Sequence, residues 1–172
     1  MAILPIVKYP DPRLRLKSTA VEDFNDALKT LALDMSETML DAPGAGLAAP
    51  QVGHNIRMVV IAGAENDEEF DERCLVLVNP EITWSGGEQT YDEGCLSVVD
   101  LNEKVIRAQE VEVKAQDIDG NPISLSADGR RAVILQHEID HLDGVLFLDH
   151  ISQLKRDIYK RRIKKMQKEG AD

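Results

Sequence analysis

Cysteine is scarce in this 172-residue chain, which contains only Cys74 and Cys95. No basic segment followed by an apolar run opens the chain, so the sequence shows no signal peptide. A disulfide scaffold is therefore not indicated, and at least one thiol is available as a metal ligand in a reducing compartment. No apolar run approaches the roughly 20 residues that a membrane-spanning helix needs. We expect a cytoplasmic protein with no membrane partner.

Signatures of nucleotide binding are also absent. Residues 44–51 read Gly-Ala-Gly-Leu-Ala-Ala-Pro-Gln, without the Gly-Lys-Ser/Thr of a phosphate-binding loop or the spacing G-x-G-x-x-G. Small residues let a ligand approach the backbone closely, and Gln51 adds an amide side chain. The pattern indicates a ligand-binding segment without specifying the class of ligand.

Positive charge is deficient overall but concentrated at the C-terminus. The net charge is −11, yet residues 151–172 contain eight Lys/Arg and three Asp/Glu, which leaves −16 for the remainder. An acidic body disfavours general nucleic-acid binding, so we expect no sequence-specific nucleic-acid partner. A basic C-terminal helix could still dock on an RNA-rich surface, and a solvated helix face is the alternative.

Two of the four histidines lie in Gln136-His137-Glu138-Ile139-Asp140-His141. Each helical residue advances about 100°, so His137 and His141 would lie roughly 40° apart on one face. Both imidazoles could then bind one metal ion, with Glu138 placed to hold a metal-bound water. The alternative is a helix with two hydrogen-bonded histidines and a solvated glutamate.

This helix is expected to lie in the interior of the domain. Ser126 or Asp128 can cap its start and Gly144 can end it, and apolar residues occupy much of its circumference. Burying the polar motif without partners would be costly, and a metal ion is the simplest partner.

The rest of the chain predicts a single α+β domain. Apolar spacing predicts an amphipathic helix over residues 22–42, and residues 64–73 form an acidic linker. We expect turns at Asn79-Pro80 and Gly86-Gly87. Strand-length segments fall at residues 57–61, 74–78, 81–84, 104–107, 110–117, 122–125 and 144–148. This order indicates antiparallel sheets wrapped around the histidine-bearing helix, with residues 1–150 as the main part of the domain and 151–172 as a basic helix of the same domain.

A third ligand is needed for a catalytic metal site. A metzincin would carry histidine at position 147, which is Phe147, and a thermolysin-like site would need a downstream glutamate, of which only Glu169 exists. A cysteine is then the candidate. Cys95 follows a glycine among strand-like residues, whereas Cys74 begins an apolar run and is expected to be a core thiol.

Together, residues 44–51, Glu93-Gly94-Cys95-Leu96-Ser97 and residues 136–141 resemble the three signature motifs of peptide deformylases, in the family's order. The helical C-terminus resembles the bacterial type 1 members. The resemblance implies that Cys95, His137 and His141 bind one Fe²⁺ per chain, replaceable by Zn²⁺, Ni²⁺ or Co²⁺. It also implies a hydrolase that removes the N-formyl group from formyl-methionine of nascent polypeptides and releases formate.

The expected chemistry assigns roles to further residues. Glu138 would accept a proton from water and pass it to the departing amine. The Gln51 amide and the Leu96 backbone N–H would stabilise the oxyanion, as the resemblance implies. Glu93 and Arg107 are candidate hydrogen-bond partners of the metal ligands.

Substrate contacts are expected from two segments. Arg130, Val133 and Ile134 would lie on the same helix face as His137, where Val133 and Ile134 suit a methionine side chain. Pure core packing is the alternative for these two residues. Gly44 and Gly46 could pair with the peptide backbone as an added strand.

Two departures from the family pattern affect the rim of the substrate site. Val98-Val99-Asp100-Leu101-Asn102 replaces a segment that often carries Pro-Gly or a nearby arginine, and Arg130 stands where an apolar residue is common. Two other functions remain open, a zinc peptidase and a structural metal-binding module.

Overall fold

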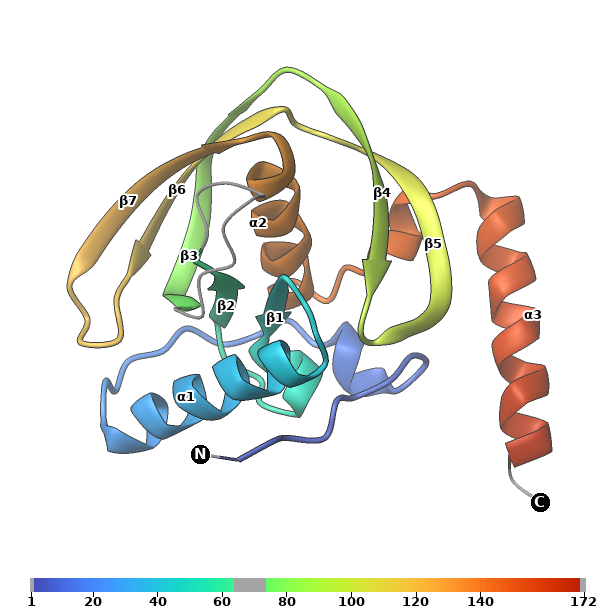
Figure 1. Ribbon diagram of the computed structural model, residues 1–172, viewed down its shortest axis with the longest axis horizontal. Helices are drawn as coiled ribbons and strands as arrows, with labels where there is room; N and C mark the ends of the chain where they lie inside the picture. Colours follow the sequence, from blue (N-terminus) through green and yellow to red (C-terminus); the bar gives the residue numbers. More distant parts are fainter. Residues whose placement is uncertain (1, 64–73, 171–172) are drawn as a thin grey trace.

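The computed structural model describes residues 2–63 and 74–170 (Figure 1). The expected acidic linker at residues 64–73 lies outside this part. Helices are α1 (Asp26–Asp41), α2 (Gly129–Leu142) and α3 (Gln153–Gly170), with short 3-10 turns η1 (Pro12–Arg15), η2 (Ala49–Val52) and η3 (Phe147–His150). The strands are β1 (Gly46–Ala48), β2 (Met58–Ala62), β3 (Cys74–Gly86), β4 (Gln89–Cys95), β5 (Val98–Arg107), β6 (Glu110–Gln116) and β7 (Pro122–Asp128).

Two antiparallel sheets surround α2. One sheet has five strands in the order β1-β2-β3-β6-β7, and the other consists of β4 and β5. In Figure 1, α2 stands between the β3, β6 and β7 strands on one side and the β4–β5 ribbon on the other. The predicted α+β fold around a central helix, with a further helix at the C-terminus, is confirmed.

The α2 helix is interior because its apolar face packs against the five-stranded sheet and its histidine-bearing face is buried as well. Leu135, Ile139 and Leu142 pack with Leu77 and Val113 of the five-stranded sheet. Removing apolar surface from water contributes about 25 cal/mol per Å², so fully burying each such side chain stabilises the fold by about 1.5–3 kcal/mol. The helix that carries the histidines is thereby fixed against the sheet.

The ends of α2 follow the sequence prediction in part. Asp128 occupies the N-cap position but its side chain caps no backbone N–H, and Ser126 lies within β7. Gly144 follows the helix with φ +74°, and a Cβ there would lie 2.5 Å from the Arg15 carbonyl oxygen. Glycine is needed at this position for both reasons.

The turn predicted at Asn79-Pro80 is wrong, because β3 continues through it. Asn79 has φ +51° and the register with β6 shifts there. Its side chain donates to the Val21 carbonyl and to the Gln116 side chain and accepts from the Val21 N–H. These contacts from distant segments turn an expected break into a bulge.

The strand predicted at residues 144–148 is also wrong. The segment runs into η3, and Leu146, which precedes this turn, is buried together with Phe147 and Leu148. A short apolar run buried on several sides cannot be assigned to strand or helix by periodicity.

The first helix begins later than predicted, at Asp26, because the Asn25 side chain accepts a hydrogen bond from the Leu28 N–H and caps the helix there.

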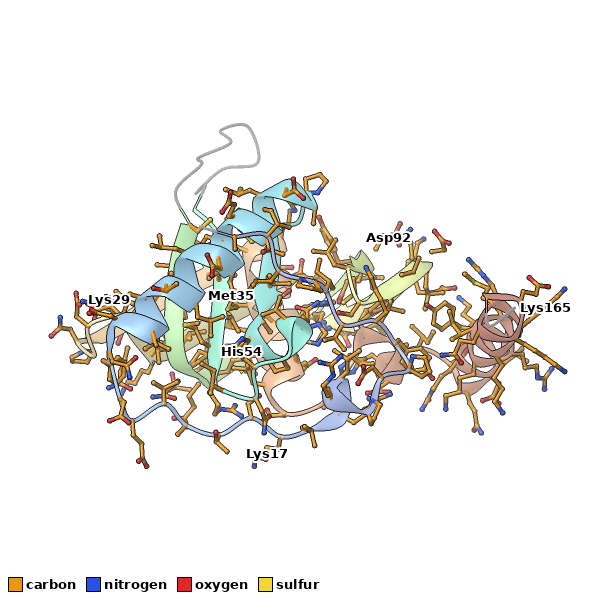
Figure 2. All side chains as sticks on the ribbon, turned by 90° about the horizontal axis from the view of Figure 1, so that it is seen from below. Lys17, Lys29, Met35, His54, Asp92 and Lys165 are labelled. Carbon is orange, nitrogen blue, oxygen red and sulfur yellow. The ribbon has the colours of Figure 1, made fainter. Side chains whose placement is uncertain are left out.

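The basic helix α3 packs against β5 through a narrow face. Tyr159 and Ile163 are buried in a cluster with Val98 and Leu146, and the Tyr159 hydroxyl donates to the Val99 carbonyl at 2.8 Å. Figure 2 shows α3 at one end of the molecule with side chains projecting around most of it. Within the described ranges, no helix combines the length and apolar character needed to cross a membrane.

Candidate metal centre

Three side-chain atoms converge where α2 faces the end of β4. The Nε2 atoms of His137 and His141 lie 3.3 Å apart, and the Cys95 sulfur lies 3.4 Å from His141 Nε2. All three ligand atoms are within 4.8 Å of one another. Atoms bound at about 2.0–2.3 Å to one tetrahedral ion lie roughly 3.3–3.8 Å apart, so the donor set fits a divalent metal.

Contacts with Glu93 and Phe147 fix the orientation of the His137 ring. Its Nδ1 donates to Glu93 Oε1 at 2.9 Å, which leaves Nε2 facing Cys95 and His141. Its ring also stacks on Phe147, with centroids 6.0 Å apart. Nδ1 of His141 is buried without a hydrogen-bond partner among the described residues, and burial lowers the pKa of this imidazole well below its usual value.

Glu93 and Arg107, predicted as hydrogen-bond partners of the ligands, form a buried ion pair. Arg107 donates to both carboxylate oxygens of Glu93, at 2.8 and 2.9 Å. Burial favours the protonated acid, but hydrogen bonds from Arg107 and His137 outweigh it and lower the pKa of Glu93 to about 2. Glu93 is therefore a carboxylate beside His137.

Glu138 is buried next to the three-atom cluster. Its Oε1 lies 3.9 Å from His137 Nε2, and its Oε2 has no hydrogen-bond partner in the part of the chain that is described. Burial raises the pKa of Glu138 to about 7. A carboxyl group with such a pKa can gain and lose a proton near neutral pH.

Gln51 is held with its amide nitrogen toward the cluster. Its Oε1 accepts from the Ala48 N–H at 2.9 Å, while Nε2 donates to Ser97 Oγ at 3.1 Å and approaches the Cys95 sulfur at 3.6 Å. Fixing both ends of the amide in this way sets its orientation. Leu96, the other predicted oxyanion donor, follows Cys95 directly and its carbonyl accepts from Lys8 Nζ at 2.8 Å.

A cavity of about 420 Å³ opens beside the cluster. The predicted site residues that line it are Gly44, Gly46, Gln51, Cys95, Leu96, Arg130, Val133, Ile134, His137 and Glu138. His141 is buried beside His137 and is not part of the lining. Sequence reasoning missed Pro43, Tyr91 and Asp92, although Tyr91 and Asp92 stand directly before the Glu93 motif on β4.

Gly46 must be a glycine for Glu138 to keep its position. A Cβ at Gly46 would lie 2.8 Å from Glu138 Cγ and 3.0 Å from its Oε1. We expect Gly46→Ala to displace the carboxylate and lower kcat/KM about 10²-fold, since a shift of about 1 Å at a reacting group has this effect. Peptide turnover and metal content should be measured together.

Gly44→Ala is the matched control, because the tightest contact of its Cβ would be with the flexible end of Leu96, at 3.0 Å from Cδ1, and the Gly46 carbonyl oxygen would lie at an ordinary 3.6 Å. Its kcat/KM should fall much less. Equal losses in the two variants would contradict the explanation based on Glu138.

Comparisons with known proteins give one consistent result. A family model described as polypeptide deformylase matches residues 3–157. The peptide deformylase of Desulfotalea psychrophila is 50% identical over 165 residues, covering 96% of this chain and 97% of that protein. That of Acidobacterium capsulatum is 50% identical over 170 residues, covering 99% of each.

Solved structures agree. The crystal structure of a peptide deformylase from Legionella pneumophila is 45% identical, with a TM-score of 0.88, and the match covers 99% of this chain and 98% of that one. A peptide deformylase from Ehrlichia chaffeensis in complex with actinonin is 39% identical, with a TM-score of 0.89 and coverage of 96% and 98%.

Proposed function

The chain belongs to the polypeptide deformylase family, whose members remove the N-formyl group from nascent polypeptides, and we propose that Cys95, His137 and His141 hold the metal ion for this reaction. The observation that carries the proposal is the convergence of one thiol and two imidazoles beside the buried carboxyl group of Glu138. A purely structural metal site would need neither the buried carboxyl group of Glu138 nor the oriented amide of Gln51 at the same point.

The experiment is a formate-release assay on the metal-loaded protein. A formyl-methionyl tripeptide should be hydrolysed, whereas the matched acetyl-methionyl tripeptide and casein should not. Cleavage of casein without formate release would favour the peptidase, and stable metal binding without either activity would favour a structural module.

The residues of this cavity have separate roles in the reaction. A divalent ion held by the three ligand atoms supplies Lewis acidity, which lowers the pKa of water and polarises a carbonyl group. Glu138 takes a proton from the water molecule while the oxygen of that water forms a bond to the formyl carbon. Glu138 then gives the proton to the amine nitrogen as the C–N bond breaks. The Gln51 amide and the Leu96 backbone N–H stabilise negative charge on the formyl oxygen, each contributing about 10²–10³ in rate.

Substrate binding uses a sheet edge beside the cavity and an apolar wall. β1 is an edge strand of the five-stranded sheet, so the backbone of Gly44 and Gly46 can accept an extended peptide as an added strand. Strand addition binds a peptide through its backbone, so most side chains of the peptide are not selected. Val133 and Ile134 line the cavity and receive the methionine side chain.

We propose Fe²⁺ as the native metal, one per chain, with Zn²⁺, Ni²⁺ or Co²⁺ able to replace it. Thiolate and imidazole ligands suit these borderline ions and disfavour Mg²⁺ or Ca²⁺. Metal analysis after anaerobic purification, paired with the formate assay, tests the assignment. Isolation of fully active protein containing only zinc would contradict it.

We further propose a cytoplasmic enzyme in which residues 1–150 and 151–172 form one domain. The support is the shared apolar cluster that joins Tyr159 and Ile163 of α3 to Val98 and Leu146. Most of the basic side chains of α3 stay exposed on this domain and are available for an electrostatic, sequence-independent contact with the ribosome.

The ribosome contact is tested without disturbing the packed face of α3. The quadruple variant replaces, each by glutamine, the exposed residues Lys160, Arg161, Lys164 and Lys165. We expect its cosedimentation with ribosomes at low salt to fall by more than about tenfold, because each phosphate contact contributes to the salt-dependent affinity. Turnover of the formyl-methionyl tripeptide should not change.

A control variant removes the same number of charges from the body. It replaces, each by glutamine, the exposed residues Lys17, Lys29, Lys104 and Lys114. Equal loss of cosedimentation in both variants would show that net charge, not α3, governs the contact.

A further inference from the structure

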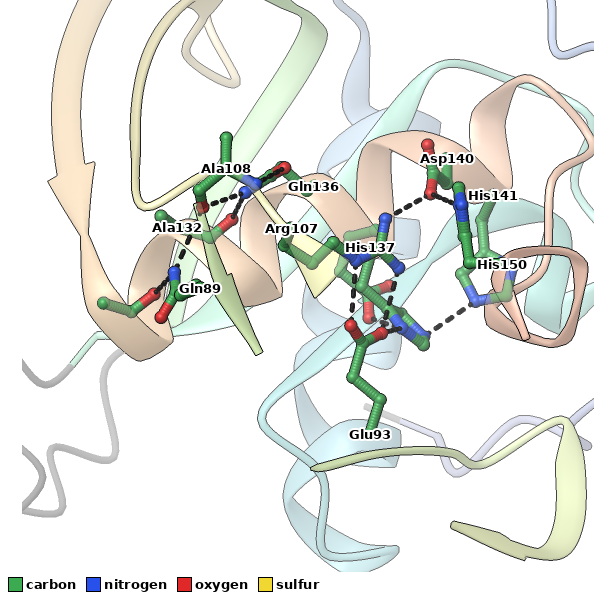
Figure 3. A network of polar contacts seen from close by, with 12 residues as sticks. Gln89, Glu93, Arg107, Ala108, Ala132, Gln136, His137, Asp140, His141 and His150 are labelled. Carbon is green, nitrogen blue, oxygen red and sulfur yellow. Dashed lines mark hydrogen bonds and ion pairs between the residues drawn. The ribbon is translucent and has the colours of Figure 1, made fainter. Parts of the chain in front are cut away.

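A chain of polar contacts leads from His137 to the protein surface, as Figure 3 shows. His137 Nδ1 donates to Glu93, and Glu93 accepts two bonds from Arg107. Arg107 Nη1 then donates to Asp140 Oδ2 at 2.6 Å, and His150 Nε2 donates to the same oxygen at 3.0 Å. The contacts join β4, β5, α2 and η3.

Arg107 is the centre of this chain. Its side chain is 4% exposed and bonds two carboxylates through Nε, Nη1 and Nη2. Three bonds to a planar guanidinium fix both its position and its plane. Because Glu93 is held by two of them, the orientation of the Glu93 carboxylate, and with it the ring of His137, depends on where Arg107 lies.

Asp140 holds the outer end of Arg107, and it is less protected than Glu93. The Asp140 side chain is 28% exposed and the His150 side chain 37% exposed. Both line a surface hollow of about 400 Å³ that also reaches Arg107. Water in such a hollow competes for the Asp140 carboxylate, and a second hydrogen bond reduces its freedom to rotate away from Arg107.

His150 is itself firmly placed. It ends η3, whose Asp149 accepts from the Leu146 N–H at 3.0 Å and pairs with Arg15 at 2.6 Å. Phe147, at the start of the same turn, stacks on the ring of His137. One short turn thus contacts His137 directly through Phe147 and indirectly through His150.

We propose that Asp140 and His150 are positioning residues, which act through Arg107 and Glu93 to keep Nε2 of His137 aimed at the metal. The inference rests on the proposed role of His137 as a ligand. Neither residue lines the cavity beside the cluster, so neither touches the substrate or the reacting atoms there.

The test uses His150→Ala in the intact chain. Its affinity for Co²⁺, measured by competition with a chelator, should fall about tenfold, the lower end of what such indirect partners contribute. The visible absorption of the bound Co²⁺ should change. In the metal-saturated enzyme, kcat for a formyl-methionyl tripeptide should fall while KM stays nearly constant.

His150→Gln tests the mechanism by rescue, because a side-chain amide can still donate to Asp140. It should restore Co²⁺ affinity and spectrum to near the original values. Asp140→Asn gives a second measurement within the same chain of contacts, and it should weaken Co²⁺ binding at least as much as His150→Ala. His54→Ala, which alters an exposed histidine, is the control and should change nothing.

Unchanged Co²⁺ affinity and spectrum in both His150→Ala and Asp140→Asn would overturn the inference. His137→Ala separates that result from a failure of the proposed function. If His137→Ala loses Co²⁺ while the two other variants keep it, only the positioning role is wrong. If His137→Ala also keeps Co²⁺ unchanged, the proposed metal centre and this inference are both wrong.

Discussion

Deformylation by the Glu138→Ala variant should fall by at least about 10³-fold while the bound metal is retained. We expect a large loss because the proposed mechanism makes one carboxyl group both the base for water and the acid for the amine, and each such role contributes about 10²–10⁴ in rate. The metal is retained because Glu138 is not one of the three converging atoms; its Oε1 lies 3.9 Å from His137 Nε2. Formate release and metal per chain should be measured on the same sample.

Glu138→Gln is the matched variant, since it keeps the shape of the side chain and removes only its ability to accept and return a proton. It should be nearly as inactive as Glu138→Ala. Neither variant should lower the free energy of unfolding much, because Oε2 of Glu138 makes no hydrogen bond within the described residues that could be lost. Turnover close to that of the unmodified enzyme would rule out Glu138 as the proton carrier.

The pair of histidines could be predicted from sequence because it depends on one helix alone. The helical repeat brings His137 and His141 together wherever the helix lies, and the distance of 3.3 Å between their Nε2 atoms agrees. Cys95 is different, since it comes from β4, 42 positions before His137 along the chain. Elimination of other ligands and the family motif indicated it, whereas spacing did not.

Features that depend on packing between distant segments were also missed, because the spacing of residues along the chain does not indicate such contacts. Asn79 reads as a turn residue locally, and only its contacts with Val21 and Gln116 keep β3 continuous. His150 lies ten positions after Asp140, beyond Gly144 and at the end of η3. Their contact depends on how η3 packs, which no local pattern encodes.

Replacing Cys95 by serine should lower the affinity for the metal, unlike the replacement of Glu138. A serine hydroxyl stays protonated near neutral pH and is a poor ligand for borderline divalent ions, whereas a thiolate binds them well. We therefore expect Cys95→Ser to lower metal affinity by at least about 10²-fold and activity in proportion, with part of the activity recovered in excess Zn²⁺ or Co²⁺. Metal titration with parallel formate assays measures both.

Cys74→Ser is the control, because Cys74 begins β3 and packs against the apolar cluster that contains Met35 and Met39 of α1, away from the three-atom site. It should keep its metal and its turnover. The contrast with Glu138 is the sharper test. Excess metal should partly rescue Cys95→Ser but leave Glu138→Ala inactive, because the proposal makes Cys95 a metal ligand and Glu138 the proton carrier. Unchanged metal content and activity in Cys95→Ser would mean that a different residue completes the site with His137 and His141.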